Sequence, residues 1–512
     1  MVHVFLRLRV LVALFAAIIL VAALSWAGVS ASGSARTDSE NGDHPHGSNV
    51  ARPTVTGPIT GGSHGFPFDS SALPLSLYGY SEQEYFVAGT ATSYTNVGAL
   101  GTNGRWTVRP SSSAAYKTRI LVRRPTDPST FNGTVIVEWL NVSVGFDTTP
   151  EWAISHNEFM QTGYAWVGVS AQSVGVNGFP PGNPAGTAGA LKVWDPVRYG
   201  SLVQPGDSFS YDIYSQAGEA LRHPRGVKPL QGLKVKHLIA TGESQSAFRL
   251  ATYIDAVAPV AKLYDGYMVH SRGAGASALS QAPQPDIPAP QPTLFRTDLD
   301  VPVIAFQSES DLIVLGYFSD RQPDSAFFRD WETAGTPHAD KYHLAFDTDV
   351  DSQKALPQSQ PSLCDKPINN GPMRYVLNAA YAALNRWVQS GVAAPRAPRI
   401  DIIAGAPPTI VRDGFGNAEG GIRTPDVDVP ISTLSGLGNS SNCAIFGTTT
   451  PFSAAMLAQL YPNSFDYVSK VTTDVLIDVQ EGFILPRDAK TIIDTAVHFR
   501  LGNDRSGCCG PV

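Results

Sequence analysis

The chain has 512 residues, enough for one large domain or for two or three ordinary ones. It is 43% hydrophobic and 16% charged, with 47 glycines and 39 prolines, which predicts a loop-rich globular protein with a sizeable core and argues against a disordered chain. The formal net charge of −7 is spread without long acidic or basic runs, so nucleic-acid binding is not expected.

The first residues have the pattern of a targeting segment. Arg7 and Arg9 precede an apolar run from Val10 to Leu24, and small residues follow it. This pattern predicts a secretory signal peptide over residues 1–31, after whose removal no stable membrane insertion is expected. The alternative is an uncleaved N-terminal membrane anchor, because about 20 apolar residues suffice to span a bilayer.

The domain organisation is expected to be simple. Residues 32–60 are rich in Ser, Gly, Asp and His, a composition that predicts a flexible linker. Residues 61–512 are expected to form a single domain, with a core over about 79–395 and a C-terminal extension over about 396–512 that packs on the core.

The strands and helices are predicted from the periodicity of apolar residues. The predicted strands are 79–94, 116–124, 133–141, 164–171, the segment that begins at 235, 261–269, 301–307 and 327–332. The predicted helices are 211–221, the segment that follows Ser246, and 374–388. Strands that alternate with helices indicate an α/β fold, with a mostly parallel sheet and helices on both faces. Such sheets place their chemistry at the carboxyl ends of the strands.

The segment 235–257 is the most informative in the chain. An apolar strand runs into Gly-Glu-Ser-Gln-Ser, and a helical pattern follows. Strand, sharp turn, serine and helix form a nucleophile elbow, which makes Ser244 the candidate nucleophile. Ser246 stands where the usual pattern has glycine, and its small side chain is compatible with the close approach there. The alternative is that Ser244 only caps the helix.

A serine nucleophile needs an acid to orient its base, and in this architecture the acid follows the serine in the chain. The strand 301–307 runs into Ser-Glu-Ser-Asp, so Asp311 is the expected acid. Glu309 is the alternative acid. Either side chain could instead cap the turn that follows.

The base should be a histidine after the last strand. His338 lies on a Gly/Pro-containing loop directly after the strand 327–332. His343 is the nearest alternative. The spacing of these two histidines with Asp340 matches no familiar metal motif, so no metal or cofactor is expected. His270 could line the pocket, although a buried structural role is expected for it.

An oxyanion hole needs two N–H donors. The backbone of Gln245, directly after the nucleophile, is expected to supply the first. The loop after the strand 133–141 is expected to supply the second, from either Leu140 or Asn141. Three tryptophans near the expected pocket mouth could bind a sugar or an aryl ester, although core packing is the ordinary role of this residue type: Trp139, Trp152 and Trp194.

The chain contains four cysteines. Export permits disulfides, so Cys364 and Cys443 could form a bridge. The adjacent Cys508 and Cys509 are expected to lie outside the fold. None of the cysteine spacings resembles a zinc site.

Longer motifs resemble the secreted α/β-hydrolase-domain proteins, a family that is largely uncharacterised. The motifs are GYSEQEYFVAGTA, VEWLNVS, LKVWDPVRYG, GESQSA, AGTPHAD, CDKPINNGPMRYVLNAA, GGIRTPDVDVP and GTTTPF. The resemblance extends from about Gly79 to Ala496 and implies an α/β-hydrolase fold. It also implies a triad of Ser244, Asp311 (or Glu309) and His338.

Together these patterns predict an exported serine hydrolase, of the carboxylesterase type, that acts on a small-molecule or polymer ester through an acyl-enzyme. One alternative is an amidase or peptidase that uses the same three residues. Another is a non-catalytic surface or binding protein on a hydrolase scaffold.

Overall fold

A computed structural model of the chain describes residues 48–180, 187–354, 364–438, 440 and 443–501. The predicted signal peptide, most of the predicted linker, Cys508 and Cys509 lie outside the described residues. In the part described, no helix is long and apolar enough to cross a membrane.

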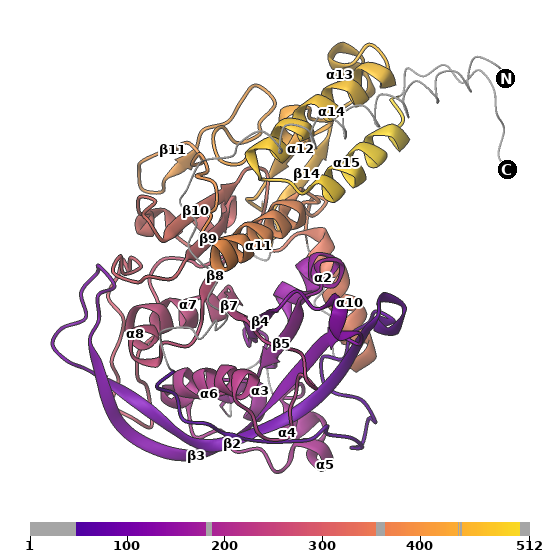
Figure 1. The fold of residues 1–512 in the computed structure, drawn as a ribbon. Coiled ribbons are helices and arrows are strands. Elements are labelled where there is room, and N and C mark those ends of the chain that lie inside the picture. The colour runs from indigo at the N-terminus through magenta and orange to yellow at the C-terminus, as the bar shows by residue number, and fades with distance from the viewer. Residues whose placement is uncertain (1–47, 181–186, 355–363, 439, 441–442, 502–512) are drawn as a thin grey trace, which may run out of the picture. The chain divides into compact units, whose positions relative to one another are not determined.

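A ten-stranded sheet forms the centre of the fold (Figure 1). Its strands are, in order across the sheet, β10 (Phe328–Thr333), β9 (Val303–Ser308), β8 (Gly266–His270), β7 (His237–Glu243), β4 (Thr134–Trp139), β5 (Ala165–Val169), β3 (Val108–Pro125), β2 (Tyr80–Asn96), β1 (Thr54–Thr56) and β6 (Arg225–Gly226). The six strands from β10 to β5 are parallel neighbours, whereas β5, β3, β2 and β1 pair antiparallel. The predicted mostly parallel sheet is therefore confirmed.

Helices cover both faces of the parallel strands because successive strand residues point to opposite sides. On β4, Val135 and Val137 belong to one core and Ile136 belongs to the other. The first core packs against α6 and α7, and the second packs against α2 and α11. These helices are α2 (Pro150–Thr162), α6 (Ser210–Arg222), α7 (Gln245–Thr252) and α11 (Met373–Ser390).

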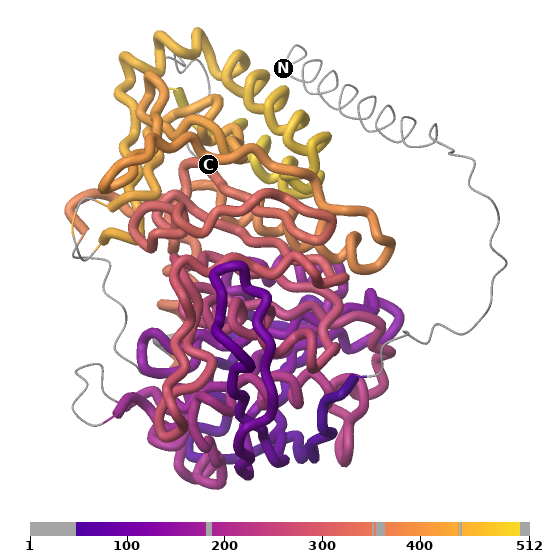
Figure 2. The backbone as a smooth tube through the Cα atoms, turned by 90° about the vertical axis from the view of Figure 1, so that its left-hand side faces the viewer, coloured from indigo at the N-terminus to yellow at the C-terminus, as the bar shows by residue number. Residues whose placement is uncertain are grey.

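The antiparallel part of the sheet is dominated by a long hairpin. Strands β2 and β3 are 17 and 18 residues long and pair along nearly their whole length, with a register shift between Thr92 and Tyr94. The hairpin tip lies beside residues 293–297 (Figure 2). There the Leu294 N–H donates to the carbonyl oxygen of Thr102 at 2.9 Å.

Three predicted boundaries were wrong. The predicted strand 116–124 is only the second half of β3, which begins at Val108. The predicted strand 261–269 begins in the short helix α8 (Ala258–Ala261), which ends at Lys262 with φ 50°, and β8 begins only at Gly266. The predicted linker 32–60 contains β1, which pairs with β2 and with β6. Three residues of a polar segment thus belong to the sheet.

The residues after α11 form an extension that packs on the α11 face of the sheet. Its helices and strands are β11 (Ile402–Ile403), β12 (Thr409–Ile410), α12 (Pro425–Asp428), β13 (Ser432–Ser435), β14 (Thr448–Pro451), α13 (Ala454–Leu460), α14 (Ser464–Glu481) and α15 (Pro486–His498). Apolar residues of α14 and α15 share one buried core with α11 and α2. Figure 1 shows these two yellow helices alongside the orange α11. The remaining helices are α3 (Ser173–Asn177), α4 (Leu191–Trp194), α5 (Pro196–Tyr199), α9 (Glu309–Ile313) and α10 (Lys341–Lys354).

Candidate active site

Ser244 occupies a sharp turn between β7, which ends at Glu243, and α7, which begins at Gln245. Its φ of 54° lies in the left-handed region, which is unfavourable for a serine and persists only where the surrounding structure enforces it. The Ser244 N–H donates to the carbonyl oxygen of His270 at 3.0 Å, which ties the turn to the neighbouring strand. The geometry is that of the predicted elbow.

The residues on either side of the elbow explain why serine replaces glycine at position 246. A Cβ at Gly242 would lie 3.1 Å from the backbone of Ser246, so strand and helix approach closely here. The Ser246 hydroxyl is fully buried, donates to the Glu243 carbonyl oxygen at 2.7 Å and accepts from the Glu243 N–H at 3.0 Å. A small hydroxyl side chain thus fits the close approach and satisfies both backbone groups of Glu243.

His338 lies on the loop after β10 and connects the serine to an acid. Its Nε2 is 2.9 Å from the Oγ of Ser244, and its Nδ1 is 2.6 Å from the Oδ1 of Asp311. Asp311 also forms a capping box at the start of α9, where its Oδ2 accepts from the N–H and the hydroxyl of Ser308 at 2.7 Å each. The structure therefore brings together Ser244, Asp311 and His338, the three residues selected from the sequence.

Burial and charge set the protonation of the acid and the base. Burial opposes ionisation of Asp311, but the His338 charge and the hydrogen bonds from His338 and Ser308 hold the pKa of Asp311 below its ordinary value. Burial by itself would lower the pKa of His338, but the carboxylates of Glu243 and Asp311 raise it above its ordinary value of 6.5. Asp311 is therefore ionised at neutral pH and oriented toward the imidazole.

Glu309, the alternative acid, contacts other groups. Its Oε1 accepts from the Gly335 N–H at 2.7 Å. Its Oε2 accepts from the Gly436 N–H at 3.0 Å and from the Arg412 guanidinium at 2.9 Å. Glu309 thus joins the loop between β10 and α10 (residues 334–340, which include His338 and are called the histidine loop) to the C-terminal extension. Asp311, in contrast, faces the imidazole.

The other two histidines considered from the sequence do not reach Ser244. His343 lies in the first turn of α10, where its Nε2 is 3.3 Å from a carboxylate oxygen of Asp347. Burial lowers its pKa, but the Asp347 carboxylate outweighs this and raises it to about 9. His270 is fully buried in β8, with its Nδ1 3.3 Å from an oxygen of Glu151.

The two N–H groups expected to supply the second oxyanion donor already have partners in the fold. The Leu140 N–H donates to the carbonyl oxygen of Val169 at 3.3 Å, and the Asn141 N–H donates to that of Thr148 at 3.2 Å. Both groups are thus engaged in pairing the end of β4 with its neighbours. The next N–H along the loop, that of Val142, makes no hydrogen bond among the described residues, and neither does the Gln245 N–H at the start of α7.

One residue beside the nucleophile was missed in the sequence. The Oε1 of Glu243 lies 3.1 Å from the Nε2 of His338, and its Oε2 accepts from the side-chain amide of Asn141 at 2.9 Å. The sequence does show a carboxylate directly before Ser244, which could have marked Glu243 as a neighbour of the candidate nucleophile. Its proximity to the histidine depends on how the loop after β10 folds over the elbow.

The family assignment follows from a match that covers most of the chain. Residues 55–494 match a family model described as an alpha/beta hydrolase domain. The chain belongs to this family. The predicted α/β-hydrolase fold is thereby confirmed, whereas the comparison with curated proteins finds no match.

Solved structures that are similar to this α/β-hydrolase include three distant ones. An α/β serine hydrolase without a lid from Xanthomonas campestris is 13% identical over 53% of this chain and 97% of its own, with a TM-score of 0.26. A carboxylesterase from Lactobacillus plantarum is 10% identical over 42% of this chain and 71% of its own, with a TM-score of 0.23. One of two fungal esterases from Rhizomucor miehei is 11% identical over 56% of this chain and 89% of its own, with a TM-score of 0.25.

The three tryptophans considered as substrate contacts pack in the cores of the α/β-hydrolase. Trp139 and Trp152 are fully buried, and Trp194 is 9% exposed. Trp139 donates its indole N–H to Gln172 at 3.1 Å, and Trp194 stacks on His64. Their burial favours a structural role.

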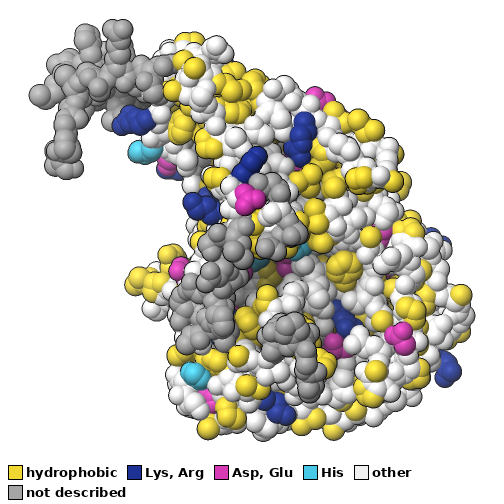
Figure 3. Space-filling view, turned by 180° about the vertical axis from the view of Figure 1, so that it is seen from behind, with side chains coloured by type: hydrophobic (Ala, Val, Ile, Leu, Met, Phe, Trp, Pro, Cys, Tyr) yellow, Lys and Arg dark blue, Asp and Glu magenta, His cyan; other side chains and the backbone are white. Residues whose placement is uncertain are grey.

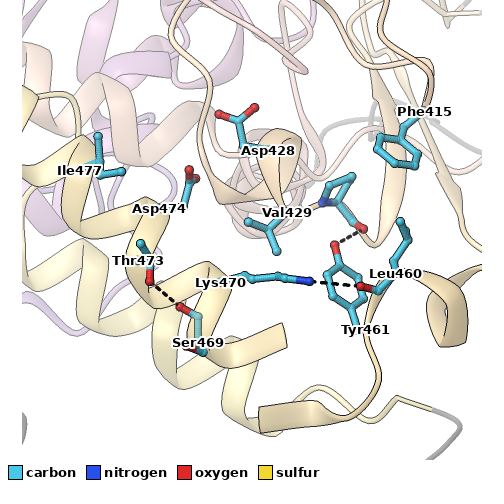
Figure 4. A pocket seen from close by; sticks show the side chains of 11 residues that line it. Phe415, Asp428, Val429, Leu460, Tyr461, Ser469, Lys470, Thr473, Asp474 and Ile477 are labelled. Carbon is cyan, nitrogen blue, oxygen red and sulfur yellow. Dashed lines mark hydrogen bonds between the residues drawn. The ribbon is translucent and has the colours of Figure 1, made fainter. Parts of the chain in front are cut away.

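Among the described residues, no group of three or more His, Cys, Asp or Glu side chains is suited to a metal ion. A cavity of about 440 Å³ in the extension is lined by charged, hydroxyl and apolar side chains, among them Asp428, Lys470 and Asp474 (Figure 4). Ser244, Asp311 and His338 are not part of its lining. On the face that Figure 3 shows, Lys and Arg side chains are scattered and form no continuous basic surface.

Proposed function

We propose that this α/β-hydrolase is an exported serine hydrolase that cleaves carboxylic esters. The observation that carries the proposal is the continuous contact from the Ser244 hydroxyl through both ring nitrogens of His338 to the buried Asp311 carboxylate. This order of nucleophile, base and orienting acid is what activates a serine at neutral pH.

In the proposed reaction, the Ser244 oxygen bonds to the acyl carbon while its proton moves to the Nε2 of His338. The carbonyl oxygen takes up the displaced electron pair and is stabilised by the N–H groups of Gln245 and Val142. The imidazolium then donates its proton to the alcohol oxygen as the carbon–oxygen bond breaks. Water repeats the sequence on the acyl-enzyme and releases the acid.

The proposed substrate is a small-molecule or polymer ester. An alcohol leaves a tetrahedral intermediate with less assistance than an amine, so this site should favour esters over amides of the same acyl group. A matched ester and amide, hydrolysed by the same preparation, would measure that preference.

Export is part of the proposal and has two supports. The first residues have the pattern of a signal peptide, and Cys364 and Cys443 form a disulfide with their Cα atoms 5.6 Å apart. Disulfides persist mainly outside the reducing cytosol. The intact mass of the mature protein would show whether the N-terminal segment is removed.

Labelling with a fluorophosphonate probe tests the proposed function without knowledge of the substrate. We expect an adduct on Ser244, located by mass spectrometry, that is absent in Ser244→Ala. In His338→Ala, labelling should be slowed by about 10²-fold or more, because general-base catalysis contributes that much. A folded wild-type protein that acquires no adduct on Ser244 would contradict the proposal and favour the non-catalytic alternative.

A further inference from the structure

Glu243 places a second carboxylate against the candidate base. It is the residue directly before Ser244, is 4% exposed, and ends β7. The Asn141 side-chain amide fixes its Oε2 at 2.9 Å, which leaves Oε1 facing the Nε2 of His338 at 3.1 Å. The same Nε2 lies 2.9 Å from the Ser244 hydroxyl, so two oxygens share one ring nitrogen.

This contact is favourable only with a proton between the two groups. In the neutral imidazole, Nδ1 donates to Asp311, so Nε2 carries a lone pair. A carboxylate oxygen at that distance also presents lone pairs, and the two repel each other. Either His338 is protonated and donates to Glu243, or Glu243 is protonated and donates to His338.

Four titratable side chains from four neighbouring elements face Glu243. They are His338 on the loop after β10, His270 on β8, His343 on α10 and Glu151 on α2, with the neutral Asn141 on the loop after β4. Burial raises the pKa of Glu243, the three histidines lower it, and Glu151 raises it. The Glu243 carboxylate in turn raises the pKa of His338.

We propose that Glu243 is a further catalytic residue, which shares a proton with the Nε2 of His338 and stabilises the imidazolium that forms when Ser244 attacks. The inference rests on the proposed function. The transferred proton is the one that leaves the Ser244 hydroxyl, and it passes from Nε2 to the leaving alcohol as the ester bond breaks. Glu243 keeps no proton at the end of the cycle, so the step is balanced.

The consequence is a pH dependence of definite sign. Only neutral His338 can accept the serine proton, and the two carboxylates raise its pKa above 6.5. Activity should therefore be present at high pH and be lost as the pH falls through a value above 6.5. Without the Glu243 charge, the imidazolium is less stable, so this acid limb should move to lower pH by about one unit.

The experiment compares wild type, Glu243→Gln and Glu243→Asp from pH 5 to pH 9. The rate of fluorophosphonate labelling of Ser244 is the first readout, because it needs no known substrate. In Glu243→Gln we expect the acid limb to shift down by about one unit and the plateau rate at high pH to fall about tenfold, the rate equivalent of that shift. Glu243→Asp keeps the negative charge, so its acid limb and its plateau rate should both lie between those of Glu243→Gln and the wild type. Glu481→Gln, which removes an exposed carboxylate at the end of α14, is the control and should leave the profile unchanged.

The outcomes separate the two proposals. A wild-type protein that is not labelled on Ser244 overturns the proposed function and this inference with it. Labelling of Ser244 with the same acid limb in wild type and Glu243→Gln overturns this inference alone. If Glu243→Gln does not fold, an NMR titration of His338 in the wild type decides, since a midpoint at or below 6.5 contradicts a second carboxylate acting on Nε2.

Discussion

The backbone of Ser244 is held in an unfavourable conformation by its neighbours on both sides. Its φ of 54° is fixed by the hydrogen bond to the His270 carbonyl oxygen and by the close approach of Gly242 and Ser246. Conformations of this kind cost on the order of 1–3 kcal/mol and tend to occur at functional sites. This backbone conformation places the Ser244 hydroxyl beyond the end of β7, where it contacts His338 on the loop after β10.

Ser246→Ala should destabilise the elbow. The substitution leaves the buried N–H of Glu243 without its hydroxyl partner, whereas the Glu243 carbonyl oxygen keeps the Asn141 side-chain amide at 3.1 Å, so the free energy of unfolding should fall by about 1–2 kcal/mol. Urea denaturation of the two proteins measures the difference. Stability equal to that of the wild type would mean that water or a backbone shift replaces the hydroxyl.

At the scale of single residues, chain order selected three side chains that the structure brings together, but it left the second oxyanion donor open. Ser244, Asp311 and His338 each follow a strand whose apolar pattern is visible, so chain order selects them. The second oxyanion donor could not be chosen, because the N–H groups of Leu140 and Asn141 are engaged by strands and loops far along the chain or across a turn. A local pattern carries no information about such pairing.

Among the elements, the start of α9, the segment before α11 and the C-terminal extension together hold the loop that carries His338. Glu309 at the start of α9 accepts from Gly335 on this loop and from Arg412 in the extension. Asn369, before α11, donates to the carbonyl oxygens of Gly335 and Ser435 at 2.9 and 3.0 Å. The extension therefore stabilises the position of the base, in addition to covering one face of the sheet.

Arg412→Ala should slow the reaction of Ser244, because it loosens the loop that carries His338. The buried Glu309 carboxylate loses its only guanidinium partner among the described residues, and the loop at Gly335 becomes less constrained. We expect the rate of Ser244 labelling to fall about tenfold, because small displacements of a catalytic group are costly. Stopped-flow or time-resolved labelling measures the rate.

Arg423→Ala is the matched control for this prediction. Arg423 also lies in the extension and is 22% exposed at its side chain, compared with 26% for Arg412, but it pairs with Asp413 and Asp428. Its removal should affect stability and leave the labelling rate unchanged. Equal slowing in both variants would indicate a general loosening of the extension.

The elements themselves were largely predictable. The strands β4, β7, β9 and β10 and the helices α6 and α11 have strong apolar patterns, and each lies within two residues of its predicted position where a range was predicted. The strand β1 was missed, because three polar and apolar residues in a Ser/Gly-rich segment have no detectable period. Its place depends on pairing with Phe86, Val87 and Ala88 of β2.

On the scale of the whole molecule, one covalent bond joins the segment before α11 to the loop between β13 and β14. Cys364 and Cys443 are 79 residues apart in the sequence. The first of these segments leads to Asn369, and the second leads to Ile445, whose carbonyl oxygen accepts from the N–H of Ala339 next to His338. The disulfide therefore joins two of the supports of the histidine loop.

Removal of this disulfide should lower stability. In Cys364→Ser/Cys443→Ser, the unfolded chain regains the freedom of a long loop, so we expect the free energy of unfolding to fall by about 2–4 kcal/mol. Cys508→Ser/Cys509→Ser is the control, and its thermal unfolding should match that of the wild type. A non-reducing peptide map that shows 364 and 443 unlinked would contradict the pairing on which the prediction depends.

Several contacts of the histidine loop depend on residues that are synthesised after it. Its supports at residues 369, 412, 436 and 445 all follow His338 in the chain. A ribosome therefore releases Ser244 and His338 before these four residues. A nascent chain therefore lacks these contacts around the histidine loop until its C-terminal segments have been made and have folded.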